Sequence, residues 1–108
     1  AAATVRANLK AAGLSAQARV VCTDAFDLLR RTKEIFDLIF VAPPQYRGLW
    51  RRALTQIDSR IGILAQDGTV IVQIDPKEWE TPRLLRLAET RRRRHGNTLL
   101  IFFVRSGD

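Results

Sequence analysis

The sequence contains one cysteine and one histidine, and these low numbers limit the chemistry that it can carry. A single cysteine, Cys22, excludes an internal disulfide framework, and its place in the apolar run RVVCTDA favours a buried, unreactive thiol. A catalytic thiol normally needs a neighbouring base, but the only histidine, His95, is expected to be a turn residue. We therefore expect neither a cysteine nucleophile nor a metal centre.

Long apolar runs are also missing. No run approaches the ~18 residues that a membrane-spanning helix requires, and the first residues do not have the pattern of a signal peptide. The sequence has no internal repeat, low-complexity tract or linker. It therefore predicts a single domain over residues 1–108, located in the cytoplasm and without a membrane partner.

Arginine is what the sequence has in excess. Among 108 residues there are 18 Lys or Arg against 11 Asp or Glu, giving a net charge of +7, and 15 of the 18 basic residues are arginine. Guanidinium groups bind phosphate through paired hydrogen bonds and stack on bases, so this excess suits a phosphate-bearing partner. A solvated surface that keeps the protein soluble is the alternative explanation.

Hydrophobic spacing predicts a helix at the start of the chain. In ATVRANLKAAGL the apolar residues recur at helical spacing, and Gly13 supplies a C-terminal stop. The run ARVVC at 18–22 suits a strand buried on both faces. A second helix is expected in TDAFDLLRR, where either Thr23 or Asp24 can cap the first turn.

The middle of the chain continues this alternation of helices and strands. The apolar run DLIFVA at 37–42 predicts a buried strand that Pro43 ends, because proline has no N–H to donate. An amphipathic helix is expected over about 49–64, then a turn at 66–68, then a strand at 69–74. Together these segments predict a parallel sheet covered by helices.

The last third predicts an antiparallel hairpin. Gly96 and Asn97 can both adopt the positive φ that a tight turn needs, between strands expected at about 87–94 and 98–105. A helix over 83–93 is the alternative. The two tryptophans, Trp50 and Trp79, are expected to pack in the core or at its edge.

Three loops follow the predicted parallel strands and carry polar or rigid residues. They are TDA at 23–25, APPQY at 42–46 and QIDP at 73–76. In open parallel sheets, the loops at the carboxyl ends of the strands form the ligand crevice. We therefore expect these three loops to meet at one edge of the sheet.

Several stretches of this sequence resemble a known family. The run RVVCTDAFDLLRRTKEIFDLIFVAPPQYRGLWRRAL, with ILAQDGTVIVQ and RRRRHGNTLLIFF after it, is similar to the bacterial RsmD-type methyltransferases. Those enzymes modify N2 of guanine in small-subunit ribosomal RNA. The resemblance implies an α/β fold with a Rossmann-like class I methyltransferase sheet, ending in the antiparallel hairpin.

The resemblance covers almost all of this chain but only the later part of the family's domain. Family members begin with a strand and a glycine-rich loop for S-adenosylmethionine, then a second strand ending in an acid. Neither segment is present in these 108 residues, so the expected sheet is partial. We expect the strand at 18–22 either to lie beside that at 37–42 in a changed order, or to be separated from it by a missing portion.

The proline loop carries the expected catalytic role. The family normally has Asp or Asn before the two prolines and an aromatic residue directly after them, whereas this chain has Ala42 and Gln45, with Tyr46 one position later. Guanine N2 is a poor nucleophile because its lone pair is delocalised, so the enzyme must accept its hydrogens and aim it. We expect the carbonyls of Ala42, Pro43 and Pro44 and the side chain of Gln45 to do so. Tyr46 would stack on a flipped base.

The resemblance also implies a cofactor site and RNA contacts. Asp24 and Ala25 would border the adenine of S-adenosylmethionine, although Asp24 as a simple helix cap is the structural alternative. Arg47, Arg51 and Arg52 follow the proline loop and are expected to contact RNA phosphates. The four arginines at 91–94 suit either a solvated face or a further RNA contact.

Two other functions compete with methyl transfer to ribosomal RNA. The first is a non-catalytic or truncated methyltransferase-like domain that binds RNA, which the missing glycine-rich loop and Ala42 favour. The second is methylation of a DNA base or a protein amide through a similar loop. The expected partner is ribosomal RNA or the small-subunit particle, and the sequence does not define the target nucleotide or the oligomeric state.

Overall fold

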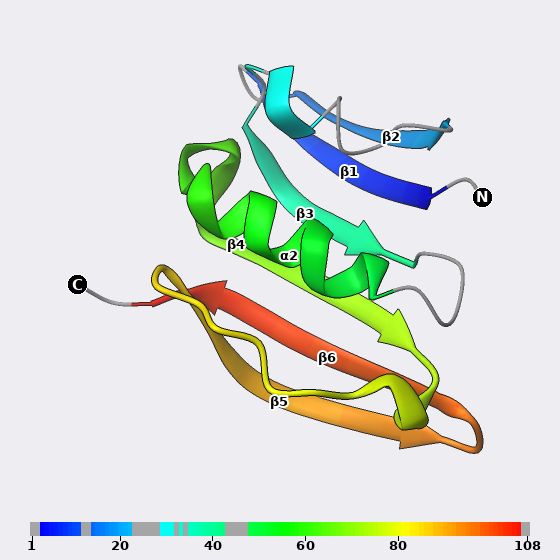
Figure 1. Ribbon diagram of the computed structural model, residues 1–108. Coiled ribbons are helices and arrows are strands. Elements are labelled where there is room, and N and C mark those ends of the chain that lie inside the picture. The colour runs from blue at the N-terminus through cyan, green and yellow to red at the C-terminus, as the bar shows by residue number, and fades with distance from the viewer. Residues whose placement is uncertain are drawn as a thin grey trace.

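The computed structural model describes residues 3–11, 14–22, 29–31, 33, 35–42 and 48–106, the first two ranges as backbone only. Within these residues the chain is an α/β protein with one mixed sheet of six strands, in the order β2-β1-β3-β4-β6-β5. The helix α2 lies across one face of this sheet (Figure 1). The elements are β1 (Ala3–Ala11), β2 (Leu14–Cys22), β3 (Phe36–Val41), α2 (Leu49–Ser59), η1 (Ile61–Ile63), β4 (Leu64–Ile74), η2 (Pro76–Glu78), β5 (Leu87–His95) and β6 (Thr98–Arg105).

The centre of the sheet is the parallel pair β3 and β4, which α2 connects. Val41 lies opposite Val72 and Ile39 opposite Val70, and all four side chains are buried. The two strands predicted from continuous apolar runs are therefore confirmed. Strands with helix-covered faces need apolar residues at most positions, which is why these runs stand out in the sequence.

The turn predicted at 66–68 is wrong, because β4 runs through these residues. The register shifts here, so that Phe36 lies opposite Leu64 whereas Leu38 lies opposite Thr69. The extra residues of β4 form an irregularity within the strand instead of a loop between elements. Turn-forming residues such as Asp67 and Gly68 suit either structure, because a bulge and a turn both interrupt regular pairing.

The N-terminal helix that we predicted is also wrong, because residues 3–11 form β1. This strand pairs antiparallel with both β2 and β3. The sequence TVRANLKA alternates polar and apolar residues as well as it fits a helical period, and the register places Val5 opposite Val41. A short helix is marginal in water without a surface to pack against, whereas pairing on both sides satisfies the backbone groups of β1.

The position of β1 corrects the predicted sheet topology. Both arrangements expected for the strand at 18–22 are wrong, because β1 of the same chain separates β2 from β3. The sheet is consequently mixed: β3 and β4 are parallel, and each of the other pairs is antiparallel.

The C-terminal hairpin is confirmed. β5 and β6 pair antiparallel with His95 opposite Thr98, and Gly96 has a φ of 57°, in the left-handed region that favours glycine. The alternative helix over 83–93 does not form. β6 then pairs with β4, so the hairpin extends the sheet beyond the parallel centre.

The core lies between α2 and the sheet. Trp50 is 1% exposed at the start of α2, and the helix ends at Ser59, earlier than the predicted 64. Arg60 leaves the helical conformation with a φ of −123°. The core side chains are Leu29, Phe36, Ile39, Val41, Trp50, Ala53, Leu54, Ile57, Ile61, Ile63, Leu64, Val70, Val72, Ile74, Leu87, Leu99, Ile101 and Phe103.

The connection from β4 to β5 packs beside α2. The ring of Trp79 stacks on that of Trp50 with centroids 5.5 Å apart and an interplanar angle of 18°. The predicted packing role is therefore confirmed for both tryptophans, with Trp50 in the core and Trp79 half-buried at its edge. In the described part of the chain, no helix has the length and apolar character needed to cross a membrane.

Candidate functional site

The carboxyl ends of three strands meet at one edge of the sheet. β3 and β4 are parallel, and β2 runs in the same direction because β2 and β3 are each antiparallel to β1. One row of paired residues crosses the sheet as Val20, Val5, Val41 and Val72. The strand ends therefore lie on the same side of this row, as the sequence predicted.

The proline loop begins at this edge, and both of its ends are fixed. Ala42 directly follows β3 and is half-buried, while β3 is hydrogen-bonded on both sides, to β1 and β4. The described chain resumes at Gly48, which has a φ of 60° and accepts a hydrogen bond from the N–H of Arg52 at 3.2 Å. The loop must therefore connect the carboxyl end of β3 to the first turn of α2.

Most of the predicted catalytic and cofactor residues lie outside the described residues. Of the proline loop, the structure places Ala42 alone. The others are Pro43, Pro44, Gln45 and Tyr46 of the loop, Asp24 and Ala25 for the cofactor, and Arg47 for RNA. Their predicted roles stay predictions, and the structure defines the strand ends to which their loops attach.

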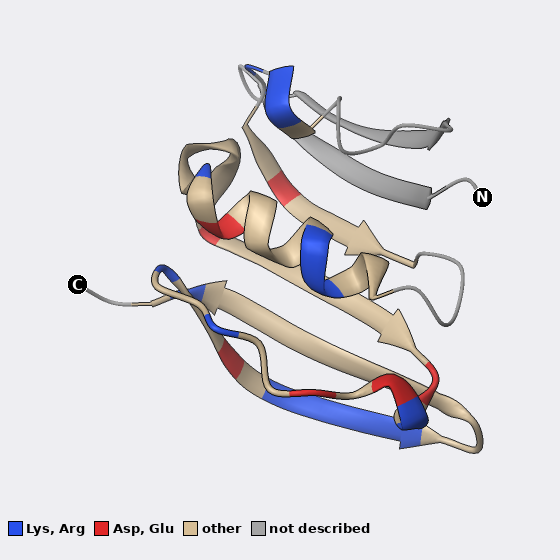
Figure 2. Cartoon of the chain, viewed as in Figure 1, with Lys and Arg blue, Asp and Glu red and all other residues tan. Residues whose placement is uncertain are grey.

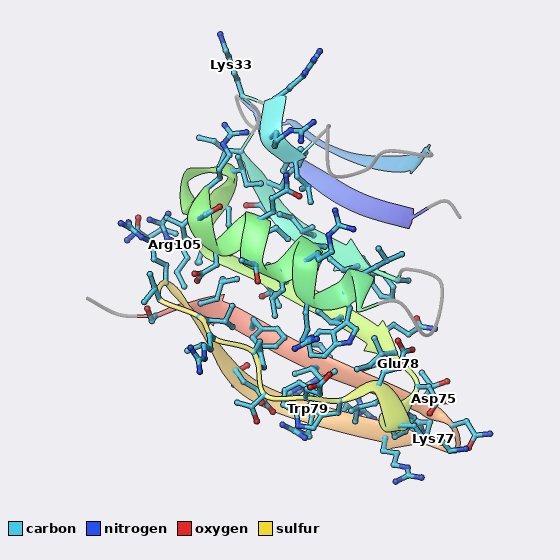
Figure 3. All side chains as sticks on the ribbon, viewed as in Figure 1. Lys33, Asp75, Lys77, Glu78, Trp79 and Arg105 are labelled. Atoms are coloured by element: carbon cyan, nitrogen blue, oxygen red, sulfur yellow. The ribbon has the colours of Figure 1, made fainter. Side chains whose placement is uncertain are left out.

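The third loop, after β4, has a clear structural role. The side chain of Asp75 accepts a hydrogen bond from the N–H of Lys77 at 2.9 Å, and Pro76 begins the short helix η2. Asp75 is thus an N-cap, which satisfies a backbone donor that the helix leaves open. Figure 3 shows Asp75, Lys77 and Glu78 grouped at the edge where β4 ends.

The two described arginines after the proline loop lie on the exposed face of α2. Arg51 forms an ion pair with Glu80 at 3.4 Å, and both side chains are largely exposed to solvent. Arg51 and Arg52 also line a groove with a volume of about 470 Å³, which Arg30 borders from the other side. The structure therefore adds Arg30 to the two arginines predicted from the sequence.

Arg30 was missed because its position depends on a contact between distant residues. The guanidinium of Arg60 donates hydrogen bonds to the carbonyl oxygens of Leu29, at 2.7 Å, and Arg30. These bonds hold residues 29–31 against the end of α2. The only local signal was that Arg30 falls in the helix expected over TDAFDLLRR, which gives no indication of a contact with α2.

The arginine run of β5 is partly used inside the chain. The guanidinium of Arg92 donates two hydrogen bonds to Glu89, at 2.7 and 2.8 Å, and lies 4.2 Å from the ring centre of Trp79. Arg91 lies 4.5 Å from the ring centre of Phe102. Figure 2 shows the basic stretch of β5, preceded on the same strand by an acidic position.

The pairing of Glu89 and Arg92 shifts both of their ionisation equilibria. The hydrogen bonds from Arg92 lower the pKa of Glu89 below its ordinary value, and partial burial opposes this effect. The same bonds raise the pKa of Arg92. Among the four arginines at 91–94, Arg92 therefore has a structural role, because its charge is already paired with Glu89.

Comparison with known proteins gives one family assignment. A family model with the description "Conserved hypothetical protein 95" matches residues 1–104 of the chain. The matched region contains all three strand ends of the candidate edge, the loops attached to them and the whole of α2. Among curated proteins, the comparison finds no match to this chain.

Proposed function

This chain belongs to the RsmD/RsmC-like methyltransferase family, and we propose that it transfers a methyl group to N2 of a guanine in small-subunit ribosomal RNA. S-adenosylmethionine would be the methyl donor. The observation that carries the proposal is the meeting of the carboxyl ends of β2, β3 and β4 at one edge, with the proline loop attached to β3. Ligands of open α/β sheets bind at such an edge. The sheet would then be part of a Rossmann-like methyltransferase sheet.

We expect the described part of the edge to accommodate an adenosyl cofactor. The ends of β2 and β3 are two strand spacings apart, roughly 10 Å, because β1 lies between them. The side chain of Ala42 is small, and β3 and β4 end in the buried apolar residues Val41 and Ile74. A flat, uncharged ring suits such surroundings. When bound, S-adenosylmethionine supplies a methyl group on a positively charged sulfur.

The residues of the chain would bind and orient the target base. Ala42 directly follows Val41, which pairs with both β1 and β4, so the sheet fixes the point at which the proline loop begins. Gln45 would accept a hydrogen of the guanine amine and so make its nitrogen a better nucleophile. Tyr46 would stack on the base after it leaves its helix.

A second function, RNA binding without catalysis, is favoured by one specific residue. Ala42 stands where the family normally has Asp or Asn, so the side-chain acceptor closest to the strand end is absent. The basic groove on α2 would be retained in such a domain. The two functions predict the same affinity for RNA but differ in binding of S-adenosylmethionine.

Methyl transfer can be tested directly on RNA that lacks the modification. The chain is incubated with S-adenosylmethionine carrying a tritiated methyl group and with unmodified small-subunit ribosomal RNA, free or assembled into particles. Nucleoside analysis should find N2-methylguanosine. Gln45→Ala should reduce the rate about a hundredfold or more, the lower end of the range for loss of an acid–base group, and Gln45→Glu should retain part of it.

Other outcomes decide between the proposals. Methylation at a different atom, or of DNA or protein, would contradict the guanine-N2 assignment. Calorimetric titration that detects RNA binding but no binding of S-adenosylmethionine would support the non-catalytic function.

A further inference from the structure

A basic groove runs along the exposed face of α2, outside the edge described above. Among the residues that the structure describes, its lining contains three arginines, two hydroxyl residues, one amide and one glycine, and no acidic residue. Figure 2 shows basic positions both on the short helical segment before β3 and on α2. The lining residues are Arg30, Gly48, Arg51, Arg52, Thr55, Gln56 and Ser59.

The helical spacing explains how α2 forms one wall of this groove. Arg51, Thr55 and Ser59 are separated by four residues each, so they occupy one face of the helix, opposite the buried Trp50 and Leu54. From the first to the last of these three the helix rises about 12 Å. This is several times the ~3.4 Å axial rise between successive phosphates of a stacked strand.

The opposite wall is held in place before any ligand binds. Arg60 donates hydrogen bonds to the carbonyls of Leu29 and Arg30, and Leu29 is 2% exposed in the core. The backbone of Arg30 is therefore fixed relative to α2. A pre-formed arrangement of cations loses less conformational freedom on binding than arginines on a mobile segment.

One end of the groove lies where the described chain resumes after the proline loop. Gly48 lines the groove and is also the residue at which the described chain resumes after the loop. Gly48 has a φ of 60°, which favours glycine, and a Cβ atom there would lie 3.7 Å from Nη2 of Arg51, an ordinary contact. A nucleic-acid strand that reaches the loop would therefore continue along α2.

We propose that this groove binds the phosphate backbone of single-stranded RNA next to the target nucleotide. The strand would leave the proline loop at Gly48 and follow α2 towards Arg30. The inference rests on the proposed function for the identity of the RNA. A free nucleotide fits less well, because no aromatic side chain lines the described groove on which its base could stack.

The test measures RNA affinity and its salt dependence without requiring catalysis. A fluorescein-labelled single-stranded RNA of twelve nucleotides is titrated with the chain at several salt concentrations, and anisotropy gives Kd. Arg30→Ala and Arg52→Ala should each weaken binding about fivefold. Each should also reduce the slope of log affinity against log salt by about 0.7, the value for one phosphate contact of a single strand.

Arg83→Ala is the matched control, because it removes the same charge from an exposed residue outside the groove. Its affinity and slope should stay near those of the wild type. Equal losses in all three variants, or no loss in Arg30→Ala and Arg52→Ala, would overturn the inference. If the groove variants lose affinity but the wild type transfers no methyl group, the proposed function fails and the groove assignment stands.

Discussion

The carboxylate of Asp58 in α2 accepts a hydrogen bond at 2.9 Å from the backbone N–H of Leu87, the first residue of β5. It also accepts bonds from the N–H groups of Arg86, at 2.7 Å, and Leu85, at 3.0 Å. Asp58 is only 6% exposed. One buried side chain therefore attaches the helix to the start of the C-terminal hairpin.

Replacement of Asp58 should destabilise the protein strongly. Asp58→Ala leaves three backbone donors without their acceptor, and we expect a loss of about 3 kcal/mol in the free energy of unfolding. Asp58→Asn should lose less, because one oxygen can still accept from Arg86 and Leu87. Urea denaturation measures both. Asp75→Asn, which preserves an exposed cap, is the control, and a loss below about 1 kcal/mol for Asp58→Ala would contradict this role.

The stack of Trp79 on Trp50 should give an optical signal. The chain has two tryptophans, and their nearly parallel rings lie 5.5 Å apart, close enough for their transitions to couple. We expect an exciton couplet in circular dichroism that Trp79→Leu abolishes. The same variant also loses the contact with Arg92, so the free energy of unfolding should fall by about 1 to 2 kcal/mol. Persistence of the couplet in the variant would disprove the stack.

The pKa of Glu89 should depend on Arg92. Side-chain NMR titration should place the pKa of Glu89 below its ordinary value, and Arg92→Gln should raise it. A lowered pKa in the folded state means that the pair stabilises the protein above the unfolded pKa. That stability is lost as the pH falls through the folded pKa. The gain should stay below about 1 kcal/mol, because the pair is solvent-exposed, and Arg93→Gln should leave the titration unchanged.

Two glycines should respond differently to the same substitution. A Cβ atom at Gly68 would lie 2.7 Å from Cδ1 of Leu64 and 3.0 Å from the carbonyl oxygen of Asp37. Gly68→Ala should therefore cost about 1 to 3 kcal/mol through overpacking. Gly62 has no atom within 4 Å of that position, so Gly62→Ala should be neutral or slightly stabilising. Thermal melts of both variants measure this difference, and a lower melting temperature for Gly68→Ala alone would support the close packing at the irregularity in β4.

The elements that the sequence predicted well are those whose local residues are compatible with only one structure. The run at 37–42 is too apolar to be exposed and is closed by proline, and Gly96 permits a turn that few other residues allow. Residues 3–11 are compatible with two structures, because the spacing of their apolar residues fits both a helix and a strand. Pairing with β3 stabilises the strand instead of the helix, and the sequence of residues 3–11 alone does not indicate that β3 is available as a partner.

The candidate site also has features that the local sequence predicts and features that depend on distant residues. The meeting of the strand ends follows from strand direction and could be predicted, whereas Arg30 reaches the groove through Arg60, thirty residues later. Asp58 does have a signal in the sequence. It is four residues after the fully buried Leu54, so a charged residue stands on the core face of a helix, where it needs partners.

The position of β5 at the end of the strand order has a consequence for solution behaviour. An outermost strand presents backbone N–H and C=O groups to which a strand of another molecule can add, and this is a route to fibrous aggregates. Four successive guanidinium groups on β5 would bring many like charges together if two copies approached along this edge. Mutual repulsion should keep such copies apart in dilute buffer, whereas concentrated salt screens it and removes the protection.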